Sequence, residues 1–252
     1  MSPSIEQRLA ARQRDVGQPV MYQAWRQLLF LHWRVDVESL QARLPDGLTV
    51  DLFEGEAYVG IVPFFMCGVR PRFLPGFPGL SNFLEVNVRT YVHDADGVPG
   101  VWFFSLDANC SPAVWVARTF FKLPYRHAVM SAQVSEVEAW VDYHSRCEEG
   151  EYDTGFRYRG KGAAREAEAG CLEFFLLERY YLFAHDPVRG RMLRGQVAHS
   201  PYRFREAEVD AFDAGPMLGQ GIIPLGSERD RGYHHACVAD DVEVKIYGLE
   251  VV

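Results

Sequence analysis

The sequence lacks the short motifs that mark the commonest catalytic sites. It contains neither Gly-x-Gly-x-x-Gly nor a P-loop, which argues against the standard dinucleotide and nucleoside triphosphate sites. It has no His-Glu-x-x-His, the helix motif of zinc proteases. No Gly-x-Ser-x-Gly surrounds Ser105, Ser111 or Ser200, so a serine hydrolase is not expected. Any chemistry must therefore be argued from individual side chains.

Cysteine is scarce and unpatterned, and long apolar runs are absent. The 5 cysteines are odd in number and none has Cys-x-x-Cys spacing, so we expect neither a disulfide framework nor a Cys-rich zinc site. Residues 1–19 are charged rather than apolar, so no signal peptide is predicted. No apolar run approaches the ~20 residues that span a bilayer. These absences favour a cytoplasmic protein with reduced thiols and no membrane partner.

Positive charge is also deficient. The formal net charge is -8, and the nearest basic patch is the short cluster of Arg189, Arg191 and Arg194. Because nucleic acid binding needs a concentrated basic face, we expect no nucleic acid partner. The neighbours His234 and His235 suggest a metal site, but adjacent residues of a strand point to opposite faces. We therefore predict no metal and no cofactor.

The chain is rich in hydrophobic residues, at 48%, and in aromatic residues, at 13%. This composition favours a large core and β structure. We expect a mainly β (α+β) fold in one domain over residues 1–252, with 1–18 as an arm or short helix. The pattern predicts strands at 22–35, 48–54, 56–66, 83–93, 99–107, 127–147, 152–159, 191–199 and 233–248, and we expect those at 48–54 and 56–66 to form a hairpin around Glu54-Gly55. It predicts helices at 37–44, at 111–121, in the first half of 172–183 and at 205–212, with loops at 67–82 and 161–170.

The strand at 83–92 carries the most informative pattern. Glu85, Asn87, Arg89 and Tyr91 recur at spacing two, so they share one face. An acid, an amide, a base and a phenol in a row indicate either the lining of a polar cavity or a surface or salt-bridged face. A cavity is favoured because a buried charge without a partner is costly and needs a purpose.

A second group of candidate residues follows between 117 and 126. Arg118 could bind a carboxylate bidentately or stabilise a structural carboxylate. Lys122, if desolvated, could attack a carbonyl, or its ammonium could extend into water. Tyr125 and Arg126 come directly after Pro124, and alternation along the chain sends their side chains in opposite directions.

Many elements of the chain resemble the YqjF-like family of uncharacterised bacterial proteins, which is similar to the acetoacetate decarboxylase superfamily. The resemblance rests on Leu31-His-Trp33, Leu44-Pro-Asp-Gly-Leu48, Gly60-Ile-Val-Pro-Phe64, Phe83-Leu-Glu-Val-Asn-Val-Arg-Thr-Tyr91, Phe103-Phe-Ser-Leu-Asp107, Ala117-Arg118, Leu123-Pro-Tyr125 and Glu178-Arg-Tyr180. It implies a cone-shaped antiparallel β-barrel with a few short helices around a cavity, in a protein that often forms homo-oligomers.

Acetoacetate decarboxylase itself carries a cavity Glu, a helix Arg and a Pro-Lys-Lys segment whose first lysine forms the Schiff base. By this resemblance Glu85, Arg118 and Pro124 match, but Tyr125 and Arg126 stand where the two lysines should be. Tyr cannot form an imine and Arg remains protonated. Acetoacetate decarboxylation by the usual mechanism is therefore not expected.

These observations lead to a cavity protein for a small organic acid or carbonyl compound. Glu85 and Tyr125, with Lys122 as a displaced nucleophile, are the candidate catalytic residues. Arg126, Arg118, Arg89 and Asn87 are the candidate substrate-binding residues. Lyase or hydratase chemistry through enol stabilisation is one hypothesis. A non-catalytic binding or sensing module and a structural interface are the alternatives.

Overall fold

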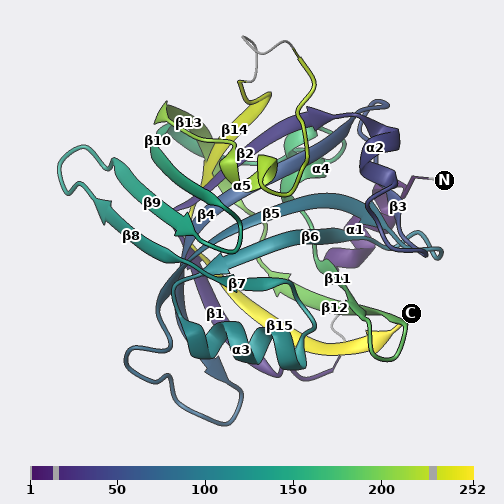
Figure 1. Ribbon diagram of the computed structural model, residues 1–252. Helices are drawn as coiled ribbons and strands as arrows, with labels where there is room; N and C mark the ends of the chain where they lie inside the picture. Colours follow the sequence, from purple (N-terminus) through teal and green to yellow (C-terminus); the bar gives the residue numbers. More distant parts are fainter. Residues whose placement is uncertain (1, 14–16, 227–231) are drawn as a thin grey trace.

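The structure is a computed structural model that describes residues 2–13, 17–226 and 232–252 (Figure 1). The strands are β1 (Met21–Arg26), β2 (Leu28–Val35), β3 (Thr49–Val50), β4 (Ala57–Pro71), β5 (Phe83–His93), β6 (Pro99–Ala108), β7 (Tyr125–His127), β8 (Val129–Val134), β9 (Val141–Cys147), β10 (Tyr152–Glu166), β11 (Tyr181–Asp186), β12 (Arg191–His199), β13 (Arg203–Ala211), β14 (His235–Ala239) and β15 (Val242–Val251). The helices are α1 (Ile5–Gln13), α2 (Val37–Gln41), α3 (Ser111–Phe120), α4 (Leu172–Leu177) and α5 (Gly215–Leu218). The predicted mainly β class is confirmed.

The sheet closes into a ring because β4 pairs on both of its edges. It pairs with β5 along one edge, and with β2 and then β1 along the other. From β5 the pairing continues through β6, β11, β12 and β15 to β1, which returns to β4. This closed ring corresponds to the barrel that the family resemblance implies. Its pairs are antiparallel except for β6 with β11, and the short β7 also joins β6 in parallel.

A second wall covers the outer face of β5. Strands β2, β14, β13, β10, β9 and β8 continue from β4 as one sheet. Val86 and Val88 of β5 pack in a buried cluster with Tyr143 of β9 and Phe156 of β10. The opposite face of β5, with Tyr91, belongs to the cluster inside the ring. Because both faces are covered, every polar side chain in the middle of β5 is hidden from solvent.

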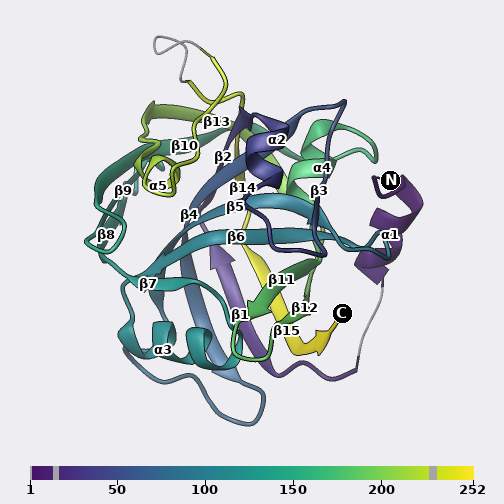
Figure 2. The same ribbon diagram turned by 45° about the vertical axis from the view of Figure 1, so that its right-hand side comes forward.

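Helix α3 covers one end of the ring, and the loop that follows β4 lies beside it in both views (Figures 1 and 2). Pro112 occupies the first turn, where its missing N–H removes no helical hydrogen bond. Val114 is buried, and Ala113, Ala117 and Phe121 pack partly buried against the ring interior. These positions recur at three- and four-residue spacing, so one face of α3 points into the ring.

Two predicted elements are wrong. Residues 205–212 were expected to be helical, but β13 is a strand that pairs with β10 and β14. Its place between two strands overrides a helix-compatible local sequence. The expected hairpin of 48–54 with 56–66 is reduced to one bridge between Phe53 and Glu56, and Val50 of β3 pairs with Val92 of β5 instead.

The boundaries of other elements also differ from expectation. The strand at 22–35 is divided at Gln27, which has a positive φ of 52°. Strand β4 runs to Pro71 and β10 to Glu166, so both shorten the expected loops. In each case the extension is paired, with β1 and with β13 respectively, and this pairing satisfies backbone groups that a loop would leave to water.

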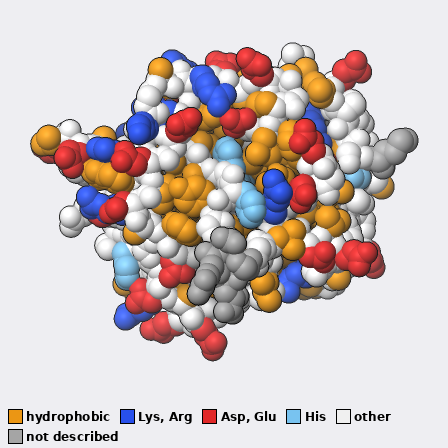
Figure 3. All heavy atoms as spheres, turned by 90° about the horizontal axis from the view of Figure 1, so that it is seen from above, with side chains coloured by type: hydrophobic (Ala, Val, Ile, Leu, Met, Phe, Trp, Pro, Cys, Tyr) orange, Lys and Arg blue, Asp and Glu red, His pale blue; other side chains and the backbone are white. Residues whose placement is uncertain are grey.

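The molecular surface is mixed in charge. Acidic and basic side chains are interspersed with hydrophobic ones on the face seen from above (Figure 3). Within the described ranges, no helix is long and apolar enough to span a bilayer.

Candidate functional site

The polar row of β5 lines a cavity inside the ring. Glu85, Asn87 and Arg89 all face it, and they are only 2%, 5% and 8% exposed. The remaining lining is largely apolar, and the cavity volume is about 110 Å³. For comparison, an engineered cavity of about 150 Å³ holds one benzene molecule. The space therefore fits a ligand of only a few heavy atoms.

Glu85 and Tyr125 form a buried pair at the cavity wall. The Tyr125 hydroxyl donates to Glu85 Oε2 at 2.7 Å. Tyr125 reaches this position because β7, directly after Pro124, pairs with β6. Desolvation raises the pKa of Glu85 to about 8, against the opposing effect of the hydrogen bonds from Tyr125 and Asn87. At neutral pH the carboxyl is therefore mostly protonated and can donate a proton or a hydrogen bond.

Arg89 is a buried cation without a carboxylate partner among the described residues. Its Nη2 donates to the Leu176 carbonyl at 3.1 Å and to the Tyr91 hydroxyl at 3.3 Å, whereas its Nε has no partner. The guanidinium lies over the ring of Phe30. The Oδ1 atom of Asn87 also lacks a partner. The cavity thus presents an unused donor, an unused acceptor and an uncompensated positive charge.

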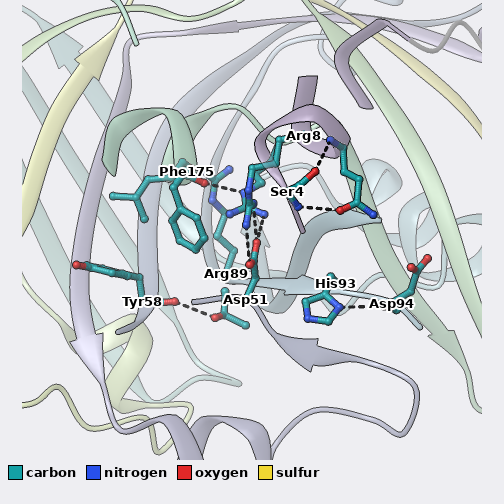
Figure 4. Close-up of polar contacts among 12 residues, drawn as sticks. Ser4, Arg8, Asp51, Tyr58, Arg89, His93, Asp94 and Phe175 are labelled. Carbon is teal, nitrogen blue, oxygen red and sulfur yellow. Dashed lines mark hydrogen bonds and ion pairs between the residues drawn. The ribbon is translucent and has the colours of Figure 1, made fainter. Parts of the chain in front are cut away.

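A second guanidinium, that of Arg179 at the end of α4, also lines the cavity. It pairs with Asp51 at 2.7 Å, and Asp51 also binds Arg8 of α1 through two contacts of 2.7 Å (Figure 4). Desolvation lowers the pKa of Arg179 to about 10 despite this carboxylate. Two cations share one anion here, so the cluster adds further positive charge beside the cavity.

Two histidines connect Arg89 to the second wall. His32 Nε2 and the Tyr91 hydroxyl are 2.6 Å apart, and His32 Nδ1 is 3.0 Å from His235 Nδ1. Burial lowers the pKa of His32 well below its usual value and that of His235 to about 4. Both rings are therefore neutral at physiological pH. They hold Tyr91, and through it Arg89, without adding charge.

The structure does not bring Arg126 to the cavity. Its guanidinium binds Asp107 bidentately, at 2.7 Å and 3.0 Å, and lies near Tyr152. The cause is the backbone alternation, since Tyr125 points into the ring and its neighbour points away. Asp107 fully occupies the fork of this guanidinium, so we assign Arg126 to the structure of the second wall rather than to a ligand.

Arg118 and Lys122 also lie elsewhere. Both line a surface groove with Asp186, outside the ring. The sequence contains only three lysines, Lys122, Lys161 and Lys245, and none of them lines the cavity. Lys122 follows the end of α3 with a positive φ of 55°, and this sharp turn directs the chain back towards β7. A Schiff-base mechanism therefore has no amine in this cavity.

Sequence reasoning missed Arg179, Asp51 and the His32–His235 pair. Glu178-Arg-Tyr180 entered the sequence analysis only through the family resemblance. The charged residues that follow the apolar run of residues 174–177 were a usable signal for a buried charge. The scarcity of lysine was another. Among the residues that the structure describes, no group of three or more His, Cys, Asp or Glu side chains could hold a metal ion.

The fold is similar to those of two solved enzymes. The enduracididine biosynthesis enzyme MppR, complexed with pyruvate, has a TM-score of 0.66 at 13% identity, covering 94% of this chain and 91% of that one. An acetoacetate decarboxylase-like enzyme from Sphingomonas wittichii RW1 has a TM-score of 0.62 at 14% identity, covering 94% of both chains. At these identities the likeness shows the fold alone, and it confirms the predicted acetoacetate decarboxylase-like architecture.

The sequence comparisons identify the family. The uncharacterized protein YqjF of Bacillus subtilis (strain 168) is 37% identical over 205 residues, which cover 79% of this chain and 82% of that protein. The profile of DUF2071, described as an uncharacterized conserved protein, matches residues 22–243. The YqjF-like resemblance is confirmed, and the chain belongs to the DUF2071 family.

Proposed function

We propose that the cavity binds a small carboxylic acid that also carries a carbonyl group. Arg89 receives the carboxylate, and the protonated Glu85, which accepts a hydrogen bond from the Tyr125 hydroxyl, donates to the carbonyl oxygen. The observation that carries this proposal is the buried Arg89 guanidinium, which has a free Nε donor and no carboxylate partner among the described residues. A buried charge is costly unless it is paired, and an anionic ligand supplies the pair.

The relatives of similar fold support the same ligand class. MppR has this fold and was found with pyruvate, an acid of a size that suits a cavity of about 110 Å³. The likeness extends to the fold and not to the chemistry. The proposal therefore depends on the polar groups of this chain.

The chemistry favoured by these groups is enolisation next to the carbonyl, in which the proton of the adjacent carbon passes to a water molecule and its electron pair moves to the carbonyl oxygen. The protonated Glu85, held in place by the Tyr125 hydroxyl, stabilises negative charge that develops on the carbonyl oxygen, as an oxyanion hole does. The excess positive charge of Arg89 and Arg179 acts in the same direction. Lyase or hydratase reactions that pass through an enolate need this stabilisation.

A non-catalytic binding or sensing module is the second candidate. It is favoured by one observation: the described residues that line the cavity include no Lys, Cys, Ser or His. These described lining residues therefore supply none of these side chains as a nucleophile for covalent catalysis. They also supply no imidazole as a general base.

Calorimetric titration with pyruvate tests the proposal. We expect binding by the wild type, and a loss of affinity of about 30-fold or more in Arg89→Met, because a charge-assisted contact contributes about 2 kcal/mol. Arg118→Met is the matched control, since Arg118 is exposed and lies outside the ring. Without ligand, Arg89→Met should be as stable as the wild type or more so, because it removes an uncompensated charge. Equal affinity in the wild type and Arg89→Met would reject the proposal.

Proton exchange separates an enzyme from a binder. If the site catalyses enolisation, the methyl signal of pyruvate in D₂O decays faster with wild-type protein than with Glu85→Gln at saturating ligand, as followed by proton NMR. If both variants bind pyruvate and neither accelerates the exchange, the binding module is the function.

A further inference from the structure

A second apolar chamber adjoins the cavity at the end that α3 covers. Its volume is about 210 Å³, and it lies between α3, the end of β4 and the loop at 72–82. Phe77 and Leu80 of the loop line it, together with Pro112, Ala113 and Val116 of α3. Among its described lining residues none is charged. The chamber has the chemistry of a site for an aliphatic or aromatic group.

The chamber and the cavity adjoin each other. They share the lining residues Met21, Gln23, Met66, Ala117, Phe121 and Tyr125. Tyr125 is one of these, so its ring lies between the two spaces while its hydroxyl binds Glu85. A ligand whose polar groups contact Glu85 and Arg89 therefore has the outer chamber directly beyond this ring.

We propose that the outer chamber holds the apolar tail of the acid whose carboxylate and carbonyl occupy the inner cavity. The substrate class is thus an oxo acid with an alkyl or aryl substituent, and pyruvate is only its shortest member. This inference rests on the proposed function of the inner cavity. It adds a binding site for the apolar tail to the polar site that Glu85, Asn87 and Arg89 of β5 form.

The chamber is suited to distinguish ligands by their apolar tails rather than by their polar groups. Its apolar lining offers a tail no ionic contact, so the gain on binding comes from the removal of apolar surface from water. Phe77 and Leu80 of the lining are themselves 47% and 45% exposed, so they form the rim of the chamber. A tail longer than the chamber therefore passes this rim into solvent.

A homologous series of ligands tests this inference. Calorimetric titration would compare pyruvate, 2-oxobutyrate, 2-oxohexanoate, 2-oxooctanoate and phenylpyruvate on the wild-type protein. We expect affinity to rise by about threefold to fourfold for each methylene that enters the chamber. Affinity should then level off once the tail reaches the exposed rim.

A variant that fills the outer chamber should remove the dependence on tail length. Ala113→Phe places a ring in the chamber and leaves the inner cavity untouched, since Ala113 lines only the outer space. We expect its affinity for pyruvate to match that of the wild type and its affinity for 2-oxooctanoate to fall to the same level. Thr119→Phe is the matched control, because Thr119 is an exposed residue of the same helix.

The outcomes distinguish this inference from the proposed function. Equal affinity for all chain lengths in the wild type would overturn the tail site and leave the inner site standing. If none of the acids binds, both proposals fail. The wild-type series decides the question even if Ala113→Phe does not fold.

Discussion

At the level of single residues, Glu85 and Arg89 differ in charge although both are buried at the same cavity. Burial keeps the Glu85 carboxyl protonated, with a pKa of about 8, whereas Arg89 retains its positive charge without a carboxylate partner among the described residues. The pair is therefore not a salt bridge across the row. One residue donates a hydrogen bond and the other attracts an anion, and this division of roles is what a site for an oxo acid needs.

The raised pKa of Glu85 predicts a pH dependence of stability. Above about pH 4.5 the unfolded chain releases this proton and the folded protein retains it, so folding loses stability as the pH rises towards 8. In Glu85→Gln this contribution is absent. We expect the free energy of unfolding of the variant, relative to the wild type, to increase by about 1 kcal/mol per pH unit from pH 5 to 8.

Urea unfolding at a series of pH values measures this difference. Above pH 8 the difference should stay constant, because the carboxyl is then ionised in both states. Glu168→Gln, at an exposed position, is the control and should show a flat difference. A flat profile for Glu85→Gln as well would show that the folded protein ionises Glu85 normally.

Part of the site could be predicted from residues alone. The spacing of Glu85, Asn87 and Arg89 on one strand fixes them on a common face, and this local geometry holds in the structure. Arg179 could not be found in this way because its place depends on the ring closing around the cavity. The same alternation separates Arg126 from Tyr125, so the predicted opposite directions of the two side chains hold and the binding role expected for Arg126 does not.

At the level of elements, the chain specifies strands with alternating patterns better than it specifies their partners. Strand β5 was predicted with its correct bounds because its two faces differ so clearly. The hairpin expected for residues 48–66 failed because β3 pairs with β5, a partner more distant in sequence. Strand β13 was missed because its pairing with β10 and β14 outweighs the local helix preference.

The contact between helix α1 and Asp51 predicts that one residue of this helix, Arg8, stabilises the folded protein. Arg8 is buried and binds Asp51, so Arg8→Gln should lower the free energy of unfolding by about 2 kcal/mol, less than for a wholly broken pair because Arg179 remains. Chemical denaturation measures this change. Arg12→Gln is the matched control on the same helix, since Arg12 is exposed. Equal stability of the two variants would contradict the role of the Arg8–Asp51 contact.

At the level of the whole molecule, the ring accounts for the fold class, and the second wall accounts for the burial of both faces of β5. The family resemblance predicted the closed architecture, which composition alone could not do because pairing order is not a local property. A single domain, cytoplasmic location and homo-oligomers stay predictions. The exposed apolar residues Phe73 and Trp115 lie at the end of the ring that would be available to a second copy.

The thiols report on the integrity of this architecture. All five cysteines are free, and Cys110, Cys147 and Cys237 are buried. We expect the native protein to react with a maleimide only at Cys67 and Cys171, and slowly, since burial raises the pKa of both thiols. Intact mass should show modification of all five thiols in denaturant, with or without a reductant. Rapid labelling of all five in the native state would contradict the buried placement.

The position of the three lysines has a kinetic consequence. Because no lysine is among the described residues that line the cavity, a carbonyl compound held there forms no imine with a lysine and needs no hydrolysis before it leaves. Its residence time is set by non-covalent contacts alone, so occupancy follows the surrounding concentration without a chemical delay. Lysine-directed immobilisation would likewise leave the cavity free, so these exchange rates can be measured on a surface-bound protein.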